Sequence, residues 1–208
     1  MENNSNNNIK AFNIKTWAYL FLPIILYVFL SWLLEIILSV LEIRVNLYPL
    51  IKTIILLFIL CLFLFYHIRK NDLKADIFIS LPRSKELALV IVIAVVLGCI
   101  SKFALRALAP NTATIPFDLL NVLTYVILVP SLEETLYRGY FIQQGEKIMG
   151  RTTAVVLSTL LFAFAHRTTA QILMSIPIGF ILSLVYAKGR NLLYPILIHG
   201  IINLIILI

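Results

Sequence analysis

Residues 17–40 have the sequence WAYLFLPIILYVFLSWLLEIILSV, an apolar run that contains a single charged side chain, Glu35. The run exceeds the roughly 20 residues that a helix needs to cross a bilayer. It is also longer than the apolar region of a secretory signal peptide, and it lacks a clear small-residue cleavage site. The sequence therefore predicts a helix that anchors the chain in a membrane.

Similar apolar runs recur along the rest of the chain, at residues 47–66, 87–108, 117–129, 154–165, 172–187 and 192–208. Only 13% of the 208 residues are charged and 61% are hydrophobic, whereas a soluble domain has about 25% charged residues. We therefore expect an all-α fold, a polytopic membrane helix bundle of about 6–8 membrane helices. Residues 1–16 are expected to form a polar, Asn-rich, disordered leader, and residues 17–208 a single transmembrane domain.

The chain has a net charge of +7, and the positions of its basic residues indicate its orientation in the membrane. In an alternating topology, most basic residues fall on one side: Lys10, Lys15, Arg69, Lys70, Lys74, Arg83, Lys85, Lys147, Arg151, Lys188 and Arg190. The other side has Arg44, Lys102, Arg106 and Arg167, with Lys52 near a helix end. Because basic residues of membrane proteins collect on the cytoplasmic side, we expect a cytoplasmic N-terminus in a bacterial cell membrane. The lipid bilayer is then the partner that explains the charge, and no nucleic acid is needed.

Most polar side chains in or beside the apolar runs have a structural explanation. Glu35, Lys52 and Asp118 lie near expected helix ends, where capping or snorkelling explains them. His67 precedes two basic residues and is typical of the membrane interface. The two cysteines, Cys61 and Cys99, lie in separate apolar runs, so neither a disulfide framework nor a thiolate zinc site is expected.

The stretch SLEETLYRG, residues 131–139, is harder to explain because it brings three charges into an apolar environment. Ser131 and Glu134 have the spacing of a capping box, which would start a helix directly after Pro130. Glu134 and Arg138 are one helical turn apart and can form an ion pair. This structural interpretation accounts for Glu134 better than for Glu133.

Three more polar residues join these carboxylates in the C-terminal half. His166 ends the string FAFAH, and His199 begins HGIIN, in which Asn203 follows four residues later on the same helix face. Each of these buried groups needs a hydrogen-bond partner or water. Mutual pairing would satisfy them together, so a common site is favoured over separate structural roles.

A helical hairpin would bring these residues to the same depth in the membrane. If residues 131–148 and 151–166 are helices joined at Met149 and Gly150, then Glu133 and His166 lie equally far from the turn, at roughly 24 Å. The polar tip of the hairpin would protrude about two turns into the cytoplasm, which leaves both residues on the order of 13 Å deep. His199, about eight residues past the cytoplasmic Arg190, reaches a similar depth. We therefore predict that Glu133, His166, His199 and Asn203 face one cavity that is open toward the cytoplasm.

The chemistry of such a cluster is hydrolysis by activated water. A carboxylate beside a histidine can take a proton from water and return it to a leaving group. A second histidine and an amide can stabilise the oxyanion of a tetrahedral intermediate. Since these strings place no serine or cysteine in a nucleophile arrangement, water is the favoured attacking group.

The three strings resemble the motifs of a known family. EETLYR fits EExxxR, FAFAH fits FxxxH and HGIIN fits HxxxN of the CPBP family of intramembrane proteases. This family includes type II CAAX prenyl endopeptidases and bacteriocin-processing or self-immunity (Abi) proteins. The resemblance begins at Pro130, and it implies a catalytic part at about residues 117–208.

The resemblance also implies a role for each residue. Glu133 would be the base that activates water, His166 its partner, and His199 with Asn203 the oxyanion site. Glu134 and Arg138 would support them. No cofactor is favoured, although a divalent metal such as zinc is possible. In that case His166, His199 and Glu133 would be its ligands, but one Glu and two His without an HExxH helix do not define a zinc site.

Two interpretations without catalysis remain open. The buried Glu, Arg and His could form a proton relay in a small transporter, or the cluster could only fix helix packing in a scaffold or immunity protein. A transporter would be expected to show an internal repeat, and residues 1–116 contain no counterpart of SLEETLYRG. The expected substrate is a membrane-associated protein or peptide, either of the CAAX type or a bacteriocin or signal-peptide precursor.

Overall fold

A computed structural model of the chain describes residues 14–43, 47–71, 79–111 and 115–208, with side chains omitted at 14 and 67–71. Most of the expected leader, residues 1–16, lies outside these ranges. So do Lys10, Arg44 and Lys74, and the side chains of His67, Arg69 and Lys70. The predictions made for these residues therefore concern positions that the structure does not describe.

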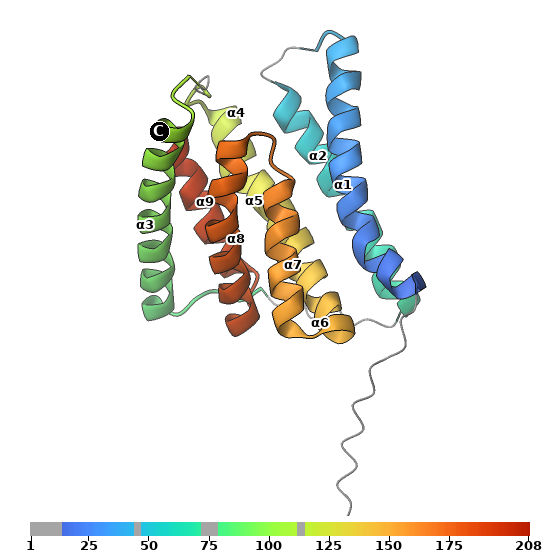
Figure 1. The fold of residues 1–208 in the computed structure, drawn as a ribbon. Coiled ribbons are helices and arrows are strands. Elements are labelled where there is room, and N and C mark those ends of the chain that lie inside the picture. Colours follow the sequence, from blue (N-terminus) through green and yellow to red (C-terminus); the bar gives the residue numbers. More distant parts are fainter. Residues whose placement is uncertain (1–13, 44–46, 72–78, 112–114) are drawn as a thin grey trace, which may run out of the picture.

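The described residues form seven separate helices, which confirms the predicted all-α bundle (Figure 1). Three of them precede the stretch SLEETLYRG: α1 (Ile14–Val40), α2 (Tyr48–Asn71) and α3 (Ser84–Leu108). A long fourth helix has the consecutive segments α4 (Leu119–Asn121), η2 (Val122–Leu128), α5 (Val129–Glu134), η3 (Thr135–Ile142) and α6 (Gln143–Met149). The last three are α7 (Arg151–Phe164), α8 (Thr169–Gly189) and α9 (Leu193–Leu207).

Five of these helices are long and apolar enough to cross a membrane: residues 15–40, 48–66, 84–108, 119–149 and 169–189. Helices α7 and α9 are also apolar but shorter. The outer faces of α1, α2 and α3 expose many large apolar side chains, among them Trp32, Phe58 and Phe103. Such a surface suits lipid rather than water. The chain is therefore a multi-pass membrane protein.

The long helix corrects one prediction about SLEETLYRG. No helix starts after Pro130, because the helix runs without a break from Leu119 to Met149. The Ser131 hydroxyl donates to Ile127 O at 2.6 Å instead of capping a helix end. Segment η2 before Pro130 is a π-helix, in which Val129 N–H bonds to Thr124 O, five residues earlier. The wider turn accommodates a proline, which has no N–H to donate.

The helix start lies further upstream, at Asp118. Its side chain accepts a hydrogen bond from Asn121 N at 2.8 Å, so the expected capping role of Asp118 is confirmed. A second π-helical segment, η3, begins directly after Glu134. Both carboxylates of the motif therefore end a short α-helical segment that has a π-helix on each side.

The turn between the long helix and α7 agrees with the predicted hairpin. Helix α6 ends at Met149, and Gly150 has φ +83°, a left-handed conformation that glycine adopts without strain. However, α7 ends at Phe164, so the predicted helix over residues 151–166 is too long. His166 lies in the loop between α7 and α8, at the opposite end of the bundle from Gly150 (Figure 1).

Helix α9 packs closely against both α3 and the π-helical segment η2. The contact with η2 is closest at Gly200, where an added Cβ would lie 2.6 Å from Val126 O. Only glycine fits there, since real Cβ atoms do not approach an oxygen so closely. The close approach fixes the position of His199, the preceding residue.

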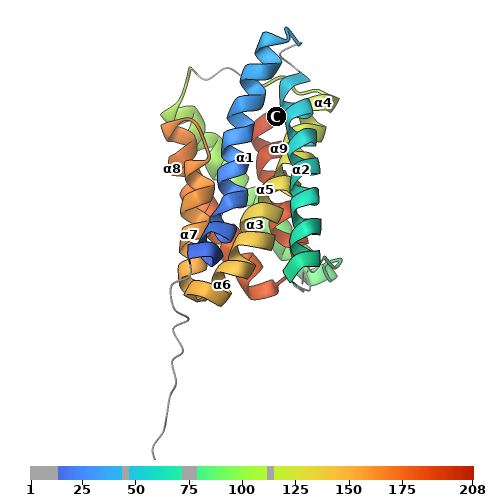
Figure 2. The ribbon, with the colours of Figure 1, turned by 90° about the vertical axis from the view of Figure 1, so that its right-hand side faces the viewer.

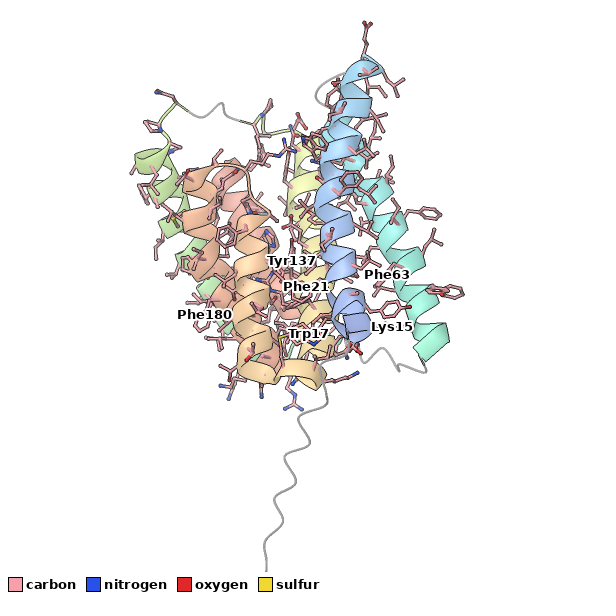
Figure 3. All side chains as sticks on the ribbon, turned by 45° about the vertical axis from the view of Figure 1, so that its right-hand side comes forward. Lys15, Trp17, Phe21, Phe63, Tyr137 and Phe180 are labelled. Carbon is pink, nitrogen blue, oxygen red and sulfur yellow. The ribbon has the colours of Figure 1, made fainter. Side chains whose placement is uncertain are left out.

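Helices α1 and α2 form a hairpin on the other side of the long helix (Figure 2). One hydrophobic cluster joins this hairpin to the long helix, through Leu20, Ile24, Leu56, Leu60, Leu132 and Leu136. Phe21 and Tyr137 lie where α1 meets the long helix (Figure 3), and Phe21 packs edge-on against Phe141 at 5.4 Å. The N-terminal hairpin therefore covers the face of α5 and η3 that carries Leu132 and Leu136.

Candidate active site

The polar cluster contains an ion pair between Glu134 and Arg138. Arg138 Nη1 lies 2.9 Å from Glu134 Oε1, and both side chains are fully buried. Arg138 also donates to Gly179 O of α8 at 2.9 Å, and its guanidinium lies 4.4 Å from the centre of the Phe162 ring. A buried charge needs such compensation, so the pair predicted from the i, i+4 spacing is held by α7 and α8 as well.

His199 is bound to the same carboxylate oxygen. Its Nδ1 lies 2.8 Å from Glu134 Oε1, and since an ionised carboxylate can only accept, the proton is assigned to Nδ1. The other ring nitrogen, Nε2, is 3.9 Å from Glu133 Oε2. His199 therefore connects the two neighbouring carboxylates, with one ring nitrogen fixed and the other directed at Glu133.

Glu133 has a partner that sequence reasoning missed. The Tyr27 hydroxyl of α1 donates to Glu133 Oε1 at 2.8 Å. The two residues are separated by 106 positions, and a single tyrosine in an apolar run is typical of a membrane helix. The only signal available in the sequence was the polar hydroxyl in the middle of the run at residues 17–40.

His166 and His199 share one aromatic neighbour. The Phe162 ring lies 5.1 Å from the His166 ring and 5.6 Å from the His199 ring, edge-on in both cases. His166 Nδ1 donates to Phe162 O at 3.0 Å. Among the described residues, no hydrogen bond joins His166 to Glu133, so the structure places His199 rather than His166 directly beside this carboxylate.

Asn203 lies one turn beyond His199 on α9. Its side-chain Nδ2 donates to Tyr125 O of η2 at 2.9 Å. A bond of this kind uses one of the two amide hydrogens, and the second is left for another acceptor. In the structure, Asn203 therefore secures α9 to the π-helical segment.

The cluster is closed to bulk solvent. Glu133 is 9% exposed and His199 6%, whereas Glu134 and Arg138 are 0% exposed. Glu134 Oε2 and Tyr137 Oη are buried and have no hydrogen-bond partner among the described residues. Buried polar atoms normally bind water or a ligand group when protein partners are lacking. The site thus combines low exposure with unused hydrogen-bonding capacity.

The potential metal ligands of the site are His166, His199 and Glu133. Within residues 14–43, 47–71, 79–111 and 115–208, no group of three or more His, Cys, Asp or Glu side chains is arranged to hold a metal ion. The two histidines each use Nδ1 for a protein partner, Glu134 in one case and Phe162 O in the other. Such a bond to a carboxylate or a backbone carbonyl orients a histidine ring, and it is also typical of metal-bound histidines.

Comparison with known proteins gives one match. Residues 115–205 match the sequence profile of the family described as type II CAAX prenyl endopeptidase Rce1-like. Searches of curated proteins and of solved structures found no match for the chain. The matched segment contains all of the buried cluster except Tyr27, and helices α1, α2 and α3 lie outside it.

Proposed function

Since residues 115–205 are a domain of the Rce1-like type II CAAX prenyl endopeptidase family, whose membership implies intramembrane protease activity, we propose that the chain is a glutamate-dependent intramembrane endopeptidase. It hydrolyses a peptide bond of a membrane-associated protein or peptide. The attacking group is a water molecule that Glu133 deprotonates. The single observation that supports this most strongly is the Glu133 carboxylate, enclosed in the bundle with His199 Nε2 at 3.9 Å from its Oε2.

Glu133 acts as the general base in this proposal. A water molecule between Glu133 and the histidines loses a proton to the carboxylate, and the resulting hydroxide attacks the peptide carbonyl. Glu133 then returns the proton to the amine that leaves. Because the site contains little bulk water, few solvent molecules compete for hydrogen bonds to the Glu133 carboxylate. The proton that Glu133 takes up is therefore passed to the leaving amine and not lost to bulk water.

His199 stabilises the oxyanion of the intermediate. With Nδ1 bonded to Glu134, only Nε2 is left to act on the substrate, and in the imidazolium form this nitrogen donates to the oxyanion. Asn203 contributes its second amide hydrogen to the same oxygen. His166, whose Nδ1 is bonded to Phe162 O, directs Nε2 toward the attacking water as the partner of Glu133.

Glu134 and Arg138 support this arrangement without touching the substrate. Arg138 holds Glu134, and Glu134 holds the tautomer and the ring orientation of His199. The logic is that of a catalytic triad, in which a buried carboxylate orients a histidine that performs the chemistry. In this proposal, Glu134 therefore has a structural role and Glu133 takes part in the reaction.

The catalytic part covers residues from about 117 to 208, inside a single transmembrane domain of residues 17–208. The end of the bundle with the start of α1, the α6–α7 turn and the end of α8 faces the cytoplasm. Lys15, Lys147, Arg151, Lys188 and Arg190 support this orientation, because they lie on these segments.

A comparison of peptide termini tests the proposal and identifies the substrate. Membranes are prepared from cells that produce the chain and from cells that produce Glu133→Gln, and the termini of membrane proteins and peptides are determined by mass spectrometry. We expect new termini, clustered in membrane-associated segments, only with the unchanged chain. Cells without the chain are the control. Termini identical in all three preparations would contradict a protease and would favour a transporter or a scaffold. New termini with both the unchanged chain and Glu133→Gln would contradict only the role of Glu133.

A further inference from the structure

Helix α1 makes polar contacts with the rest of the bundle at Tyr19, Tyr27 and Glu35, which are eight residues apart. Tyr19 O accepts from the Tyr140 hydroxyl at 2.8 Å, Tyr27 donates to Glu133, and Glu35 pairs with Arg167. A spacing of eight residues is about two helical turns plus a rotation of roughly 80°, so the three contacts follow one another along α1 on a path that winds around the helix. The middle contact reaches the candidate active site directly.

We propose that Tyr27 is a positioning residue for Glu133, an inference that rests on the proposed role of Glu133 as the base. A carboxylate has two oxygens, and the hydroxyl of Tyr27 occupies Oε1. The second oxygen, Oε2, is the one that faces His199 Nε2. Tyr27 therefore determines which oxygen takes the proton from water, and it holds that oxygen on the histidine side.

The aromatic packing around Tyr27 keeps its hydroxyl in place. Its ring lies edge-on to Tyr137 at 6.4 Å, and Tyr137 in turn lies edge-on to Phe162 at 5.5 Å. Phe162 is the ring that contacts both histidines. A continuous set of aromatic contacts thus connects the tyrosine of α1 with the two histidines across the site.

Apolar side chains lie on one side of Tyr27. A small cavity beside Tyr27 is lined by apolar side chains of α1, α2 and the long helix, among them Leu30, Leu56 and Leu132. These side chains offer the Tyr27 hydroxyl no hydrogen-bond partner, and an unpaired hydroxyl there would cost free energy. Tyr27 is the donor that the described residues provide for Glu133 on the α1 side.

The neighbouring ion pairs fix the position of α1 along its axis relative to α2 and the α7–α8 loop. Glu35 lies two turns beyond Tyr27 and pairs with Lys52 of α2 at 2.7 Å and with Arg167. Arg167 directly follows His166. One carboxylate therefore connects α1, α2 and the loop that carries a candidate catalytic histidine, although the family match covers only that loop. The N-terminal hairpin completes the site rather than only enclosing it.

The test compares two tyrosine-to-phenylalanine variants. Tyr27→Phe removes the hydroxyl that holds Glu133, and Tyr140→Phe removes the hydroxyl that bonds α1 at Tyr19, two turns away. Both variants lose one hydrogen bond between α1 and the long helix. The probe is an internally quenched peptide with the cleaved sequence found in the comparison of termini, and kcat and KM are measured per folded molecule in detergent.

We expect Tyr27→Phe to lower kcat about tenfold with KM changed less than about twofold, because a hydrogen bond to an ionised group is lost at the reacting carboxylate and not at the substrate. Tyr140→Phe should keep kcat within about twofold of the unchanged chain. In a Glu133→Gln background, Tyr27→Phe should cause no further decrease, because the two residues act as one unit.

The outcomes separate this inference from the proposed function. An unchanged chain that cleaves nothing would overturn the protease assignment itself. An active chain in which Tyr27→Phe keeps full kcat, or in which Tyr27→Phe and Tyr140→Phe lose activity equally, would overturn the positioning role alone. A further decrease in the Glu133→Gln background would also contradict it, since the effect of Tyr27 would then not pass through Glu133.

Discussion

At the scale of single residues, the two adjacent carboxylates of SLEETLYRG have different surroundings. Glu134 is fully buried and shares Oε1 between Arg138 and His199. Glu133 is bound by a neutral hydroxyl and faces a histidine across 3.9 Å. The first has two charged or polar partners in the core, and the second has fewer contacts and a small remaining exposure. This difference is the basis for assigning them different roles.

Removing either partner of the buried ion pair should reduce folded protein as well as activity. Glu134→Gln and Arg138→Ala each leave a charge without its partner in the core, at a cost of about 3–5 kcal/mol. The measurement is the fraction of detergent-extracted protein that is monodisperse, together with its unfolding temperature. Arg190→Ala is the matched control, because it breaks the exposed pair with Glu146, which contributes roughly 1 kcal/mol or less.

The prediction would be wrong if Arg138→Ala behaved like Arg190→Ala in both measurements. It would also be wrong if Glu134→Gln lost activity without any loss of folded protein. In that second case, Glu134 would take part in the chemistry directly and not through the orientation of His199.

Thorough chelation should leave cleavage unchanged. The proposed base, Glu133, takes a proton from water without the help of a Lewis acid. The measurement is the rate of peptide cleavage before and after dialysis against a strong chelator. A loss of activity that one particular divalent ion restores would make Glu133 and the two histidines ligands instead.

Part of this residue-level arrangement could be predicted from the sequence. The Glu134–Arg138 pair follows from the spacing of one helical turn. The bond from His199 to Glu134 did not follow, because the three strings indicate a common site but not which nitrogen meets which oxygen. Tyr27 was not predictable either, since nothing local distinguishes it from other tyrosines in apolar helices.

At the scale of elements, the apolar runs predicted the helices well, and the polar interruptions predicted the ends poorly. The run at residues 17–40 corresponds closely to α1, and Gly150 marks the α6–α7 turn. Pro130 and Ser131 indicated a break, yet the chain continues through them because a π-helical turn absorbs the proline. Tertiary contacts of η2 with α9 stabilise that turn, and a local pattern contains no information about them.

The contact between α9 and η2 gives a prediction for Gly200. Gly200→Ala places a Cβ at 2.6 Å from Val126 O, and a backbone carbonyl cannot rotate away as a side chain can. We expect destabilisation of at least about 1–3 kcal/mol and a larger loss of activity, since His199 moves with α9. Gly139→Ala is the control, because the added Cβ would lie 3.4 Å from the nearest atom of the Leu192 side chain. That side chain is flexible and the distance is an ordinary van der Waals contact, so little has to move.

Thermal unfolding and cleavage rate are measured for both glycine variants. Equal unfolding temperatures for Gly200→Ala and Gly139→Ala would contradict the close approach of α9 to η2. A stable Gly200→Ala protein with full activity would show in addition that the position of His199 does not depend on this contact.

At the scale of the whole molecule, the site is assembled from two parts of the chain. The family match covers residues 115–205, and the α1–α2 hairpin outside it provides Tyr27 and the Glu35 ion pairs. The hairpin packs on the long helix through a mostly apolar cluster. Composition and charge were sufficient to predict a polytopic bundle, but they could not show that the N-terminal half contacts the Glu133 carboxylate.

The orientation of the bundle gives a prediction that labelling can check. Thr152 is the second residue of α7 and Thr169 is the first residue of α8, and these two helix starts lie at opposite ends of the bundle (Figure 1). Both residues are exposed. With Cys61 and Cys99 replaced by alanine, a membrane-impermeant maleimide should label Thr169→Cys in intact cells and Thr152→Cys only after permeabilisation. The reverse pattern would place the basic end of the bundle outside the cell.

The most direct test of the account is the specific activity of Glu133→Gln. The substitution keeps the size of the side chain and its ability to accept a hydrogen bond from Tyr27, but it removes the group that takes a proton from water. The rate of peptide cleavage per folded molecule should fall at least about 10²-fold, while the protein accumulates in the membrane at an unchanged level. Full specific activity in Glu133→Gln would contradict a glutamate-dependent protease at this site.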